Sequence, residues 1–134
     1  MELQVGVKIL LKNREGKYLI VKRSADKYPE VGARWDIPGG RINPGQTLLE
    51  NLKREVKEET GLVLEEEPKL IAAQDILRVP GRHVVRLTYL GKINGEPKLN
   101  DDNTEFRWVS YNELEKLENM DIYVKELLEK KLLT

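Results

Sequence analysis

Three glutamates that follow a glycine pair are the residues of this sequence best suited to chemistry. Glu55, Glu58 and Glu59 all fall in the segment that runs from Gly39 to Leu62. Carboxylate and carbonyl oxygens are the ligands that a hard divalent cation prefers, and Mg²⁺ takes only a few of them from a protein, which leaves positions for phosphate and water. A glycine pair lets the backbone come close to such an ion. The segment therefore indicates metal-assisted chemistry on phosphates.

A solvated acidic face is the alternative interpretation of the same glutamates. Like charges three and four residues apart destabilise a helix by a few tenths of a kcal/mol per pair, so nearby cations should compensate. Lys53, Arg54 and Lys57 would relieve that repulsion at the surface. Taken by themselves, the charges leave both interpretations open.

A single helix must carry these glutamates, and the sequence predicts both of its ends. Thr47 suits the N-cap position, and Glu50, three residues later, completes a capping box. Gly61 suits the position just past the C-terminus. The helix is therefore predicted from Leu48 to Thr60. Its apolar stripe borders the glutamates and consists of Leu48, Leu49, Leu52 and Val56.

The same segment resembles the Nudix box, GX5EX7REUXEEXGU, in which U is an aliphatic residue. The residues at its specified positions are Gly40, Gln46, Arg54, Glu55, Val56, Glu58, Glu59, Gly61 and Leu62. Eight of these nine have the family's residue type, and the spacing is kept throughout. The exception is Gln46, where the family usually has Glu. We expect Gln46 to lower the local negative charge and the metal affinity while leaving the core ligands in place.

The resemblance implies a fold, a cofactor and a set of site residues. The fold would be a Nudix-type α/β/α sandwich of the α/β (α+β) class, with a mixed β-sheet between helices, as one domain over residues 1–134. The cofactor would be Mg²⁺ or Mn²⁺. Its ligands would be Glu55, Glu58, Glu59, Asp102 and the backbone carbonyl of Gly39. The catalytic residues would be Arg54, which orients the glutamates, and either Glu55 or Asp102 as the base for water.

Asp102 enters this set through its distance from a tryptophan. Nudix enzymes often place an additional Glu, frequently followed by His, six residues before the Trp of a segment like EFRWVS. Six residues before Trp108 the sequence has Asp102, and Asn103 stands where the His would be. Glu105 is the second candidate for the same role. A solvated acidic loop is the alternative.

Four further residues are candidates for binding substrate, because their segments resemble those of MutT-like Nudix proteins. Arg23 is a candidate phosphate contact, and a solvated arginine at a strand end is the alternative. Arg82 and His83 resemble an Arg-His pair that lies near the nucleotide in some of these enzymes, although a hydrogen-bonded strand histidine explains His83 equally. Asn119 matches an Asn before the last helix, and a simple turn explains it as well.

Hydrophobic periodicity and turn residues predict the remaining elements. Strands over residues 5–11 and 18–22 form one hairpin, and strands over 69–79 and 83–90 form a second. Residues 62–64 are predicted to be extended.

The last third of the chain combines one short strand with two helices. The strand covers residues 106–109 and follows an acidic loop. That loop contains Asp101, Asp102 and Glu105. Ser110 opens a short helix over residues 111–117, and Asp121 caps a final helix. The apolar stripe of the final helix consists of Val124, Leu127, Leu128 and Leu132.

The composition narrows the class of partner. The 134 residues include 23 basic and 23 acidic ones, and this zero net charge favours neither a nucleic-acid polymer nor an anionic membrane. With no cysteine and one histidine, the chain lacks the ligands of a zinc site. No stretch approaches the roughly 20 apolar residues that span a bilayer. We therefore expect a cytoplasmic protein. The family resemblance implies that its partner is a small-molecule nucleotide substrate. A homodimer is common in the family, and the sequence identifies no interface.

The resemblance implies metal-dependent hydrolysis of a nucleoside diphosphate linked to another moiety. The favoured substrate is a nucleoside triphosphate, oxidised ones included, cleaved to the monophosphate and pyrophosphate. ADP-ribose or a nucleotide sugar is the alternative within the class. A non-catalytic Nudix-fold module that binds a nucleotide is the alternative of another class; the three retained glutamates argue against it, and Gln46 argues weakly for it.

Overall fold

The computed structural model describes residues 1–29 and 32–132 of the chain. Within them, seven strands form one sheet in the order β3-β2-β1-β6-β5, with β4 paired to β1 and β7 paired to β2. Strands β1 and β6 are parallel along 11 residues and the other pairs are antiparallel, so the sheet is mixed. The strands are β1 (Glu2–Lys12), β2 (Tyr18–Arg23), β3 (Trp35–Asp36), β4 (Gly39–Arg41), β5 (Lys69–Ile76), β6 (Arg82–Lys92) and β7 (Asn103–Val109).

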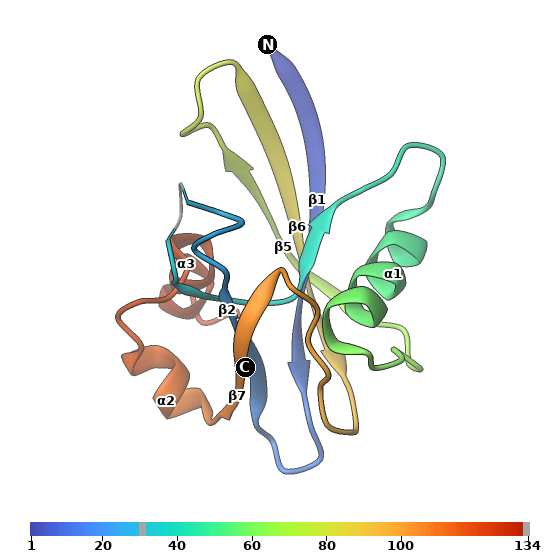
Figure 1. The fold of residues 1–134 in the computed structure, drawn as a ribbon, viewed down its shortest axis with the longest axis vertical. Helices are drawn as coiled ribbons and strands as arrows, with labels where there is room; N and C mark the ends of the chain where they lie inside the picture. Colours follow the sequence, from blue (N-terminus) through green and yellow to red (C-terminus); the bar gives the residue numbers. More distant parts are fainter. Residues whose placement is uncertain (30–31, 133–134) are drawn as a thin grey trace.

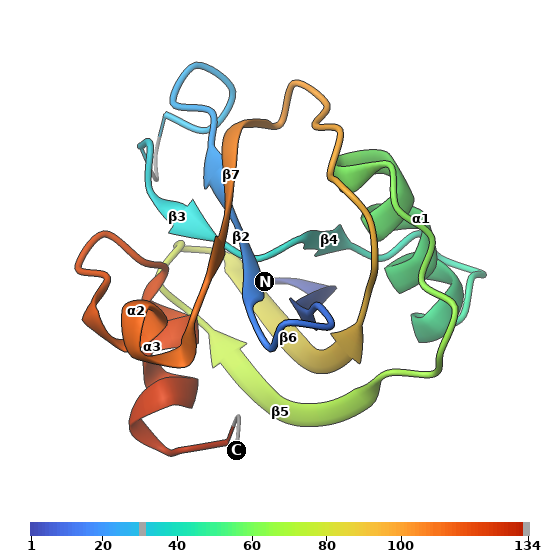
Figure 2. The same ribbon diagram turned by 90° about the horizontal axis from the view of Figure 1, so that it is seen from below.

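Helices cover both faces of this sheet. The helix α1 (Leu48–Thr60) lies on one side, and α2 (Tyr111–Lys116) and α3 (Ile122–Glu129) lie on the other (Figures 1 and 2). The predicted α/β/α sandwich with a mixed sheet is therefore confirmed.

Two apolar cores, one on each face, follow from the alternation of side chains along the strands. On β1, Val7, Ile9 and Leu11 pack on the α1 side with Leu52 and Val56 of the helix. The other core joins β1 and β2 to the two C-terminal helices. Its buried members are Leu10, Tyr18, Ile20, Trp35, Ile37, Val109, Leu114, Met120, Val124 and Leu128.

The predicted ends of α1 are confirmed. The side chain of Thr47 accepts a hydrogen bond from the Glu50 N–H, and the Glu50 carboxylate accepts one from the Thr47 N–H. Gly61 ends the helix in the left-handed conformation, with φ at +72°. The predicted stripe is partly wrong, because Leu48 in the first turn is 37% exposed while Asn51 is buried instead. The Asn51 amide can be buried because its N–H groups are satisfied by the carbonyls of residues 46 and 47.

Residues 62–64, which were predicted to be extended, lie in the connection between α1 and β5 and belong to none of the named strands. Two other local predictions need correction. Glu105 lies within β7 opposite Lys22 and not in the loop, because β7 begins earlier than the apolar residues suggested. Leu132 lies past the end of α3 and is 39% exposed, so it does not extend the stripe of that helix.

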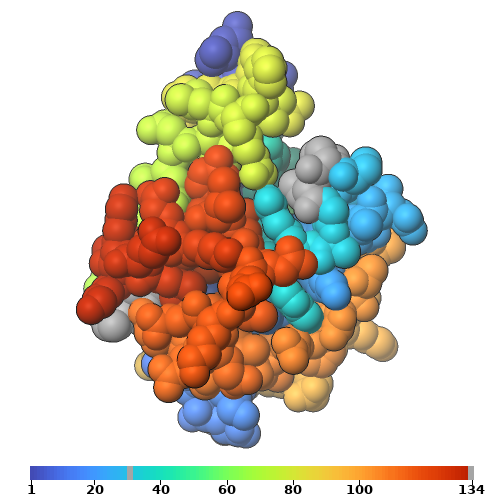
Figure 3. Space-filling view, turned by 90° about the vertical axis from the view of Figure 1, so that its left-hand side faces the viewer, coloured from blue at the N-terminus to red at the C-terminus, as the bar shows by residue number. Residues whose placement is uncertain are grey.

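One end of the molecule is a narrow projection formed by the first residues of β1 and the tip of the β5–β6 hairpin (Figures 1 and 3). This projection forms one wall of the cavity described below. None of the helices in the described ranges is long and apolar enough to cross a membrane.

Candidate active site

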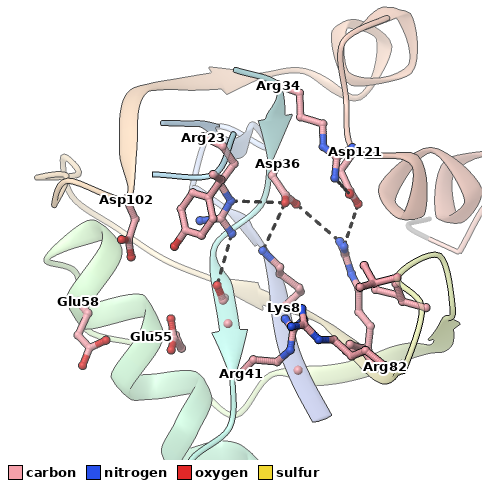
Figure 4. Close-up of a pocket in the computed structure, with 18 of the residues that line it drawn as sticks. Lys8, Arg23, Arg34, Asp36, Arg41, Glu55, Glu58, Arg82, Asp102 and Asp121 are labelled. Atoms are coloured by element: carbon pink, nitrogen blue, oxygen red, sulfur yellow. Dashed lines mark hydrogen bonds and ion pairs between the residues drawn. The ribbon is translucent and has the colours of Figure 1, made fainter. Parts of the chain in front are cut away.

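A cavity of about 720 Å³ lies where β1, β4 and β6 meet the start of α3 and the open side of α1. Its size is in the range that holds a nucleotide-sized ligand. Glu55, Glu58 and Asp102 lie on one side of it, and Arg41 and Arg82 lie on the other (Figure 4).

Glu59 is held rigidly behind this cavity. Its Oε1 accepts hydrogen bonds from Arg23 Nη1 at 3.1 Å and from Asn103 Nδ2 at 3.0 Å, and its Oε2 accepts one from the Gly39 N–H at 2.8 Å. The side chain is 1% exposed. A buried carboxylate with a cationic partner and two further donors is fixed in position. Glu59 therefore ties α1 to β4, β2 and β7.

Glu55, one turn earlier, faces the cavity with a different set of neighbours. Arg54 Nη1 contacts its Oε1 at 2.9 Å and reaches Glu58 Oε2 at 3.3 Å. Burial, followed by the charge of Glu59 and a hydrogen bond with it, raises the pKa of Glu55 to about 7, although Arg54 opposes the shift. A carboxyl group with this pKa can exchange a proton with water near neutral pH.

The glycine pair leaves the space that Glu55 occupies. A Cβ on Gly40 would lie 2.8 Å from Glu55 Oε2, so a side chain there would displace the carboxylate. At Gly39 the backbone has φ at +142°, and a Cβ would lie 2.1 Å from the Val7 carbonyl oxygen. Only glycine fits at position 39, and this glycine lets the 39–40 backbone run between β1 and α1.

A buried cluster of charges forms the floor of the cavity around Asp36. The Asp36 carboxylate lies 3.4 Å from Lys8 Nζ, 3.6 Å from Arg23 Nε and 3.7 Å from Arg86 Nη2. Burial opposes its ionisation, but the charges of Lys8, Arg86 and Arg23 hold the pKa of Asp36 well below its usual range. Burial and the charge of Arg23 lower the pKa of Lys8 to about 8. The floor therefore carries an excess of positive charge.

Asp121, the N-cap of α3, extends this cluster. Its carboxylate is ion-paired with Arg86 Nη1 at 2.9 Å and accepts a hydrogen bond from Arg34 Nη2 at 3.2 Å. It also caps the N–H groups of Tyr123 and Val124. The start of α3 is thereby fixed to the floor of the cavity.

The candidate residues outside the helix do not all reach the cavity. Asp102 lines it, and its carboxylate is ion-paired with Lys27 at 2.5 Å. Arg82 lines it as well, whereas the next residue on the strand, His83, is outside its wall and contacts Asp75 at 2.7 Å. Adjacent strand residues face opposite sides of a sheet, so Arg82 and His83 cannot act there as a pair.

Two further candidates take structural positions. Arg23 borders the cavity but is buried between Asp36 and Glu59, so it is not a solvated arginine. Asn119 lies outside the wall, where its side-chain amide donates to the Ala33 carbonyl and its own carbonyl accepts from the Trp35 N–H. Asn119 therefore joins the loop before β3 to the loop before α3.

The sequence interpretation missed Lys8, Asp36, Arg86, Asn103 and Asp121 as members of the site. Lys8 and Arg86 each stand among apolar residues in a strand, and a charge in such a strand is a signal that could have marked them. Asp36 stands next to Trp35 just before the glycine pair. Asn103 was considered only as the residue that replaces a histidine, yet it holds Glu59.

A divalent metal fits the side of the cavity that carries the α1 glutamates, because this side offers oxygen donors and because Gly40 leaves space beside Glu55. In the ranges that the structure describes, no three acidic or histidine side chains already converge as a metal site. Arg54 holds Glu55 and Glu58 instead. Metal binding would therefore require these two carboxylates to turn from Arg54 toward the ion.

Comparison with known proteins gives one family. The family model described as NUDIX domain matches residues 2–130. An ADP-ribose pyrophosphatase of Methanocaldococcus jannaschii is 34% identical over 109 residues, which cover 78% of this chain and 60% of that protein. The chain thus spans less than two thirds of the length of that relative.

Two other matches cover more of the compared protein. The nucleoside triphosphatase NudI of Escherichia coli O17:K52:H18 is 31% identical over 110 residues, which cover 75% of this chain and 77% of that protein. The crystal structure of a MutT protein from Methanosarcina mazei Go1 is similar with a TM-score of 0.85 at 27% identity, and the match covers 96% of this chain and 91% of that one.

Proposed function

We propose a function from one premise, which is that this chain belongs to the Nudix hydrolase family. The proposed reaction is metal-dependent hydrolysis of a nucleoside diphosphate linked to another moiety, with residues 1–134 acting as one domain. The observation that carries the proposal is the pair Glu55 and Glu59, one turn apart, of which one is fixed and the other faces the cavity with a pKa near neutrality.

The metal would be Mg²⁺ or Mn²⁺, held by Glu55, Glu58, Glu59, Asp102 and the Gly39 carbonyl. When bound, it would supply charge neutralisation on the phosphate oxygens and a more acidic water. The chain's own residues have distinct tasks beside it. The Gly39 N–H fixes Glu59, and the Gly39 carbonyl lies 3.5 Å from Arg23 Nη2.

Glu55 is the proposed general base. Its Oε atom takes a proton from water as the water oxygen attacks phosphorus, and the bond from phosphorus to the leaving phosphate oxygen breaks. Arg54 orients Glu55 through the 2.9 Å contact and is itself held by Asn51 Oδ1 at 2.9 Å. Asp102, the other candidate base, is engaged by Lys27, which favours Glu55.

The positive floor of the cavity is proposed to hold the phosphates. The side chains of Lys8 and Arg86 lie there, and their N–H groups can donate hydrogen bonds to the oxygens of a polyphosphate. Arg86 Nε and Nη2 are buried without a hydrogen-bond partner within the described residues. Preorganised cations next to a transferring phosphoryl group stabilise the charge that develops on it.

A nucleoside triphosphate, oxidised ones included, is the proposed substrate, with the monophosphate and pyrophosphate as products. The match to a nucleoside triphosphatase and the cationic floor support it. ADP-ribose is the second candidate, supported by the match to an ADP-ribose pyrophosphatase.

The test is a substrate panel with product identification by chromatography. Nucleoside triphosphates, 8-oxo-dGTP, ADP-ribose, nucleotide sugars and dinucleoside polyphosphates are incubated with Mg²⁺, with Mn²⁺ and with EDTA. We expect metal-dependent release of a nucleoside monophosphate from one class, and loss of that release in Glu55→Gln. Nucleotide binding without turnover of any compound would contradict the proposal and favour a binding module.

A further inference from the structure

The cavity wall opposite the α1 glutamates carries three arginines. Arg41 ends β4, Arg78 follows β5, and Arg82 begins β6. Arg41 donates to the neutral Gln4 side chain at 2.7 Å, and Arg78 lies 5.4 Å from the centre of the Tyr123 ring. Within the described residues none of the three makes an ion pair, unlike Arg23, Arg34 and Arg86 on the floor.

The strand register brings these arginines onto one surface. Gly6 of β1 pairs with Arg41 of β4 on one side and with Arg86 of β6 on the other. Arg82 lies four residues before Arg86 and so faces the same side of the sheet. Arg78 follows Ile76, which pairs with Val84 of β6, and thus lies beside the start of that strand. Figure 4 shows Arg41 and Arg82 on the same side of the cavity.

Gly6 keeps the surface between them open. The nearest atoms to a Cβ at this position would be the Gly40 carbonyl oxygen at 3.6 Å and the side chains of Arg41 and Val84, both at 3.9 Å. Ordinary van der Waals contacts would be possible there, but a longer side chain would fill the space between the arginines. A ligand can therefore approach the sheet at Gly6 with guanidinium groups on both sides.

The charge balance of the cavity differs from that of the chain. The chain has no net charge, yet eight basic and five acidic side chains line the cavity. Burial and the positive charges of Arg82 and Arg86 lower the pKa of the Arg41 guanidinium. Mutual repulsion among cations of this kind is relieved when an anion binds between them.

We infer that Arg41, Arg78 and Arg82 form a subsite for the terminal phosphate of the substrate, across the cavity from the α1 glutamates. This inference rests on the proposed function and names its substrate class. A triphosphate offers such a phosphate beyond the bond that is cleaved, whereas ADP-ribose and nucleotide sugars carry an uncharged sugar there. The arginines thus select substrates that end in phosphate.

Binding of inorganic tripolyphosphate tests the subsite independently of catalysis. Calorimetry in EDTA at low salt would compare the wild type, the double variant Arg78→Gln Arg82→Gln, and Arg14→Gln as the control. Arg14 is exposed in the β1–β2 turn and outside the cavity. We expect the double variant to bind on the order of tenfold more weakly and Arg14→Gln to bind like the wild type. Equal affinity in all three proteins would overturn the subsite.

Steady-state kinetics test the selection of substrate. In the double variant, kcat/KM for the best triphosphate should fall about tenfold through KM, while kcat/KM for ADP-ribose stays within about twofold. An equal fall for both substrates would overturn the assigned role and leave the hydrolase function intact.

If the wild type hydrolyses neither compound but binds tripolyphosphate through these arginines, the proposed function fails and the subsite stands. A competition experiment tests whether the phosphate must be terminal on a polyphosphate chain. If a nucleoside 3′-phosphate competes for the arginines as well as tripolyphosphate does, they bind a phosphate at any position, and the terminal-phosphate assignment is overturned.

Discussion

Glu55 and Glu59 are the same residue type one turn apart on one helix, but the surrounding structure gives them opposite properties. Glu59 is buried against Arg23, Asn103 and the Gly39 N–H, so both of its oxygens are engaged. Glu55 is ion-paired with Arg54 and faces the cavity, and burial and the nearby charge of Glu59 raise its pKa. Two carboxylates in such different surroundings can divide the work of anchoring and proton transfer. The difference teaches that the position of a glutamate in the box does not by itself define its role.

Removing the anchored carboxylate should have the largest effect. In Glu59→Ala, buried Arg23 loses one of its two carboxylate partners, and the Asn103 amide and the Gly39 N–H lose their acceptor. We expect the free energy of unfolding to fall by about 3–5 kcal/mol, measured by urea denaturation. Glu58→Ala is the matched control, because Glu58 is more than half exposed and should change stability by only about 0.5 kcal/mol. Equal losses in the two variants would remove the distinction between anchored and exposed glutamates.

Neutralising the cavity-facing carboxylate should separate activity from stability. Glu55→Gln keeps the size of the side chain but cannot accept a proton from water, so kcat should fall by about 10²- to 10⁴-fold. The free energy of unfolding should change by less than about 1 kcal/mol, because the ion-pair partner of Glu55, Arg54, is partly exposed, whereas Arg23 beside Glu59 is buried. Turnover by Glu55→Gln at the wild-type rate would show that Glu55 is not the base.

The raised pKa of Glu55 predicts a pH-dependent stability in metal-free protein. The folded state holds the Glu55 proton more tightly than the unfolded state between the ordinary value of 4.5 and about 7. The resulting stabilisation is complete below pH 4.5 and is lost as the pH rises through 7. In EDTA, the wild type should therefore lose about 1 kcal/mol relative to Glu55→Gln between pH 5 and pH 8, a value that allows for solvent screening. A pH-independent difference between the two proteins would mean that the pKa is not raised.

Local sequence signals were enough to predict the elements that carry the site. The ends of α1 depend on Thr47, Glu50 and Gly61, which act through hydrogen bonds and backbone conformation within a few residues. The capping box at Ser110 was confirmed for the same reason. The two hairpins were confirmed because alternation and turn residues are also local. Their arrangement as a sandwich came from the family resemblance and not from these signals.

The environment of each charged residue could not be predicted, because it depends on contacts between distant parts of the chain. Glu59 meets Arg23, 36 residues earlier, and Asn103, 44 residues later. Asp36 is surrounded by cations from β1, β2 and β6. Periodicity identifies which residues face inward but does not identify their partners. The buried side of α1 was mispredicted at Leu48 for a related reason: the buried position is taken by Asn51, whose side chain bonds the backbone of the preceding turn.

A substitution at Gln46 should have the smallest effect, and it tests whether this residue lies close enough to the α1 glutamates to influence metal binding. Its side chain is exposed and makes no hydrogen bond within the described residues; only its backbone is engaged, by Asn43 and Asn51. It is also outside the cavity wall. A carboxylate added there would be screened by solvent, so Gln46→Glu should change the Mg²⁺ concentration for half-maximal activity by less than about twofold. A tenfold tighter metal dependence would show instead that the 43–47 turn closes over the α1 glutamates when metal binds, and that Gln46 limits the affinity of this protein for its ion.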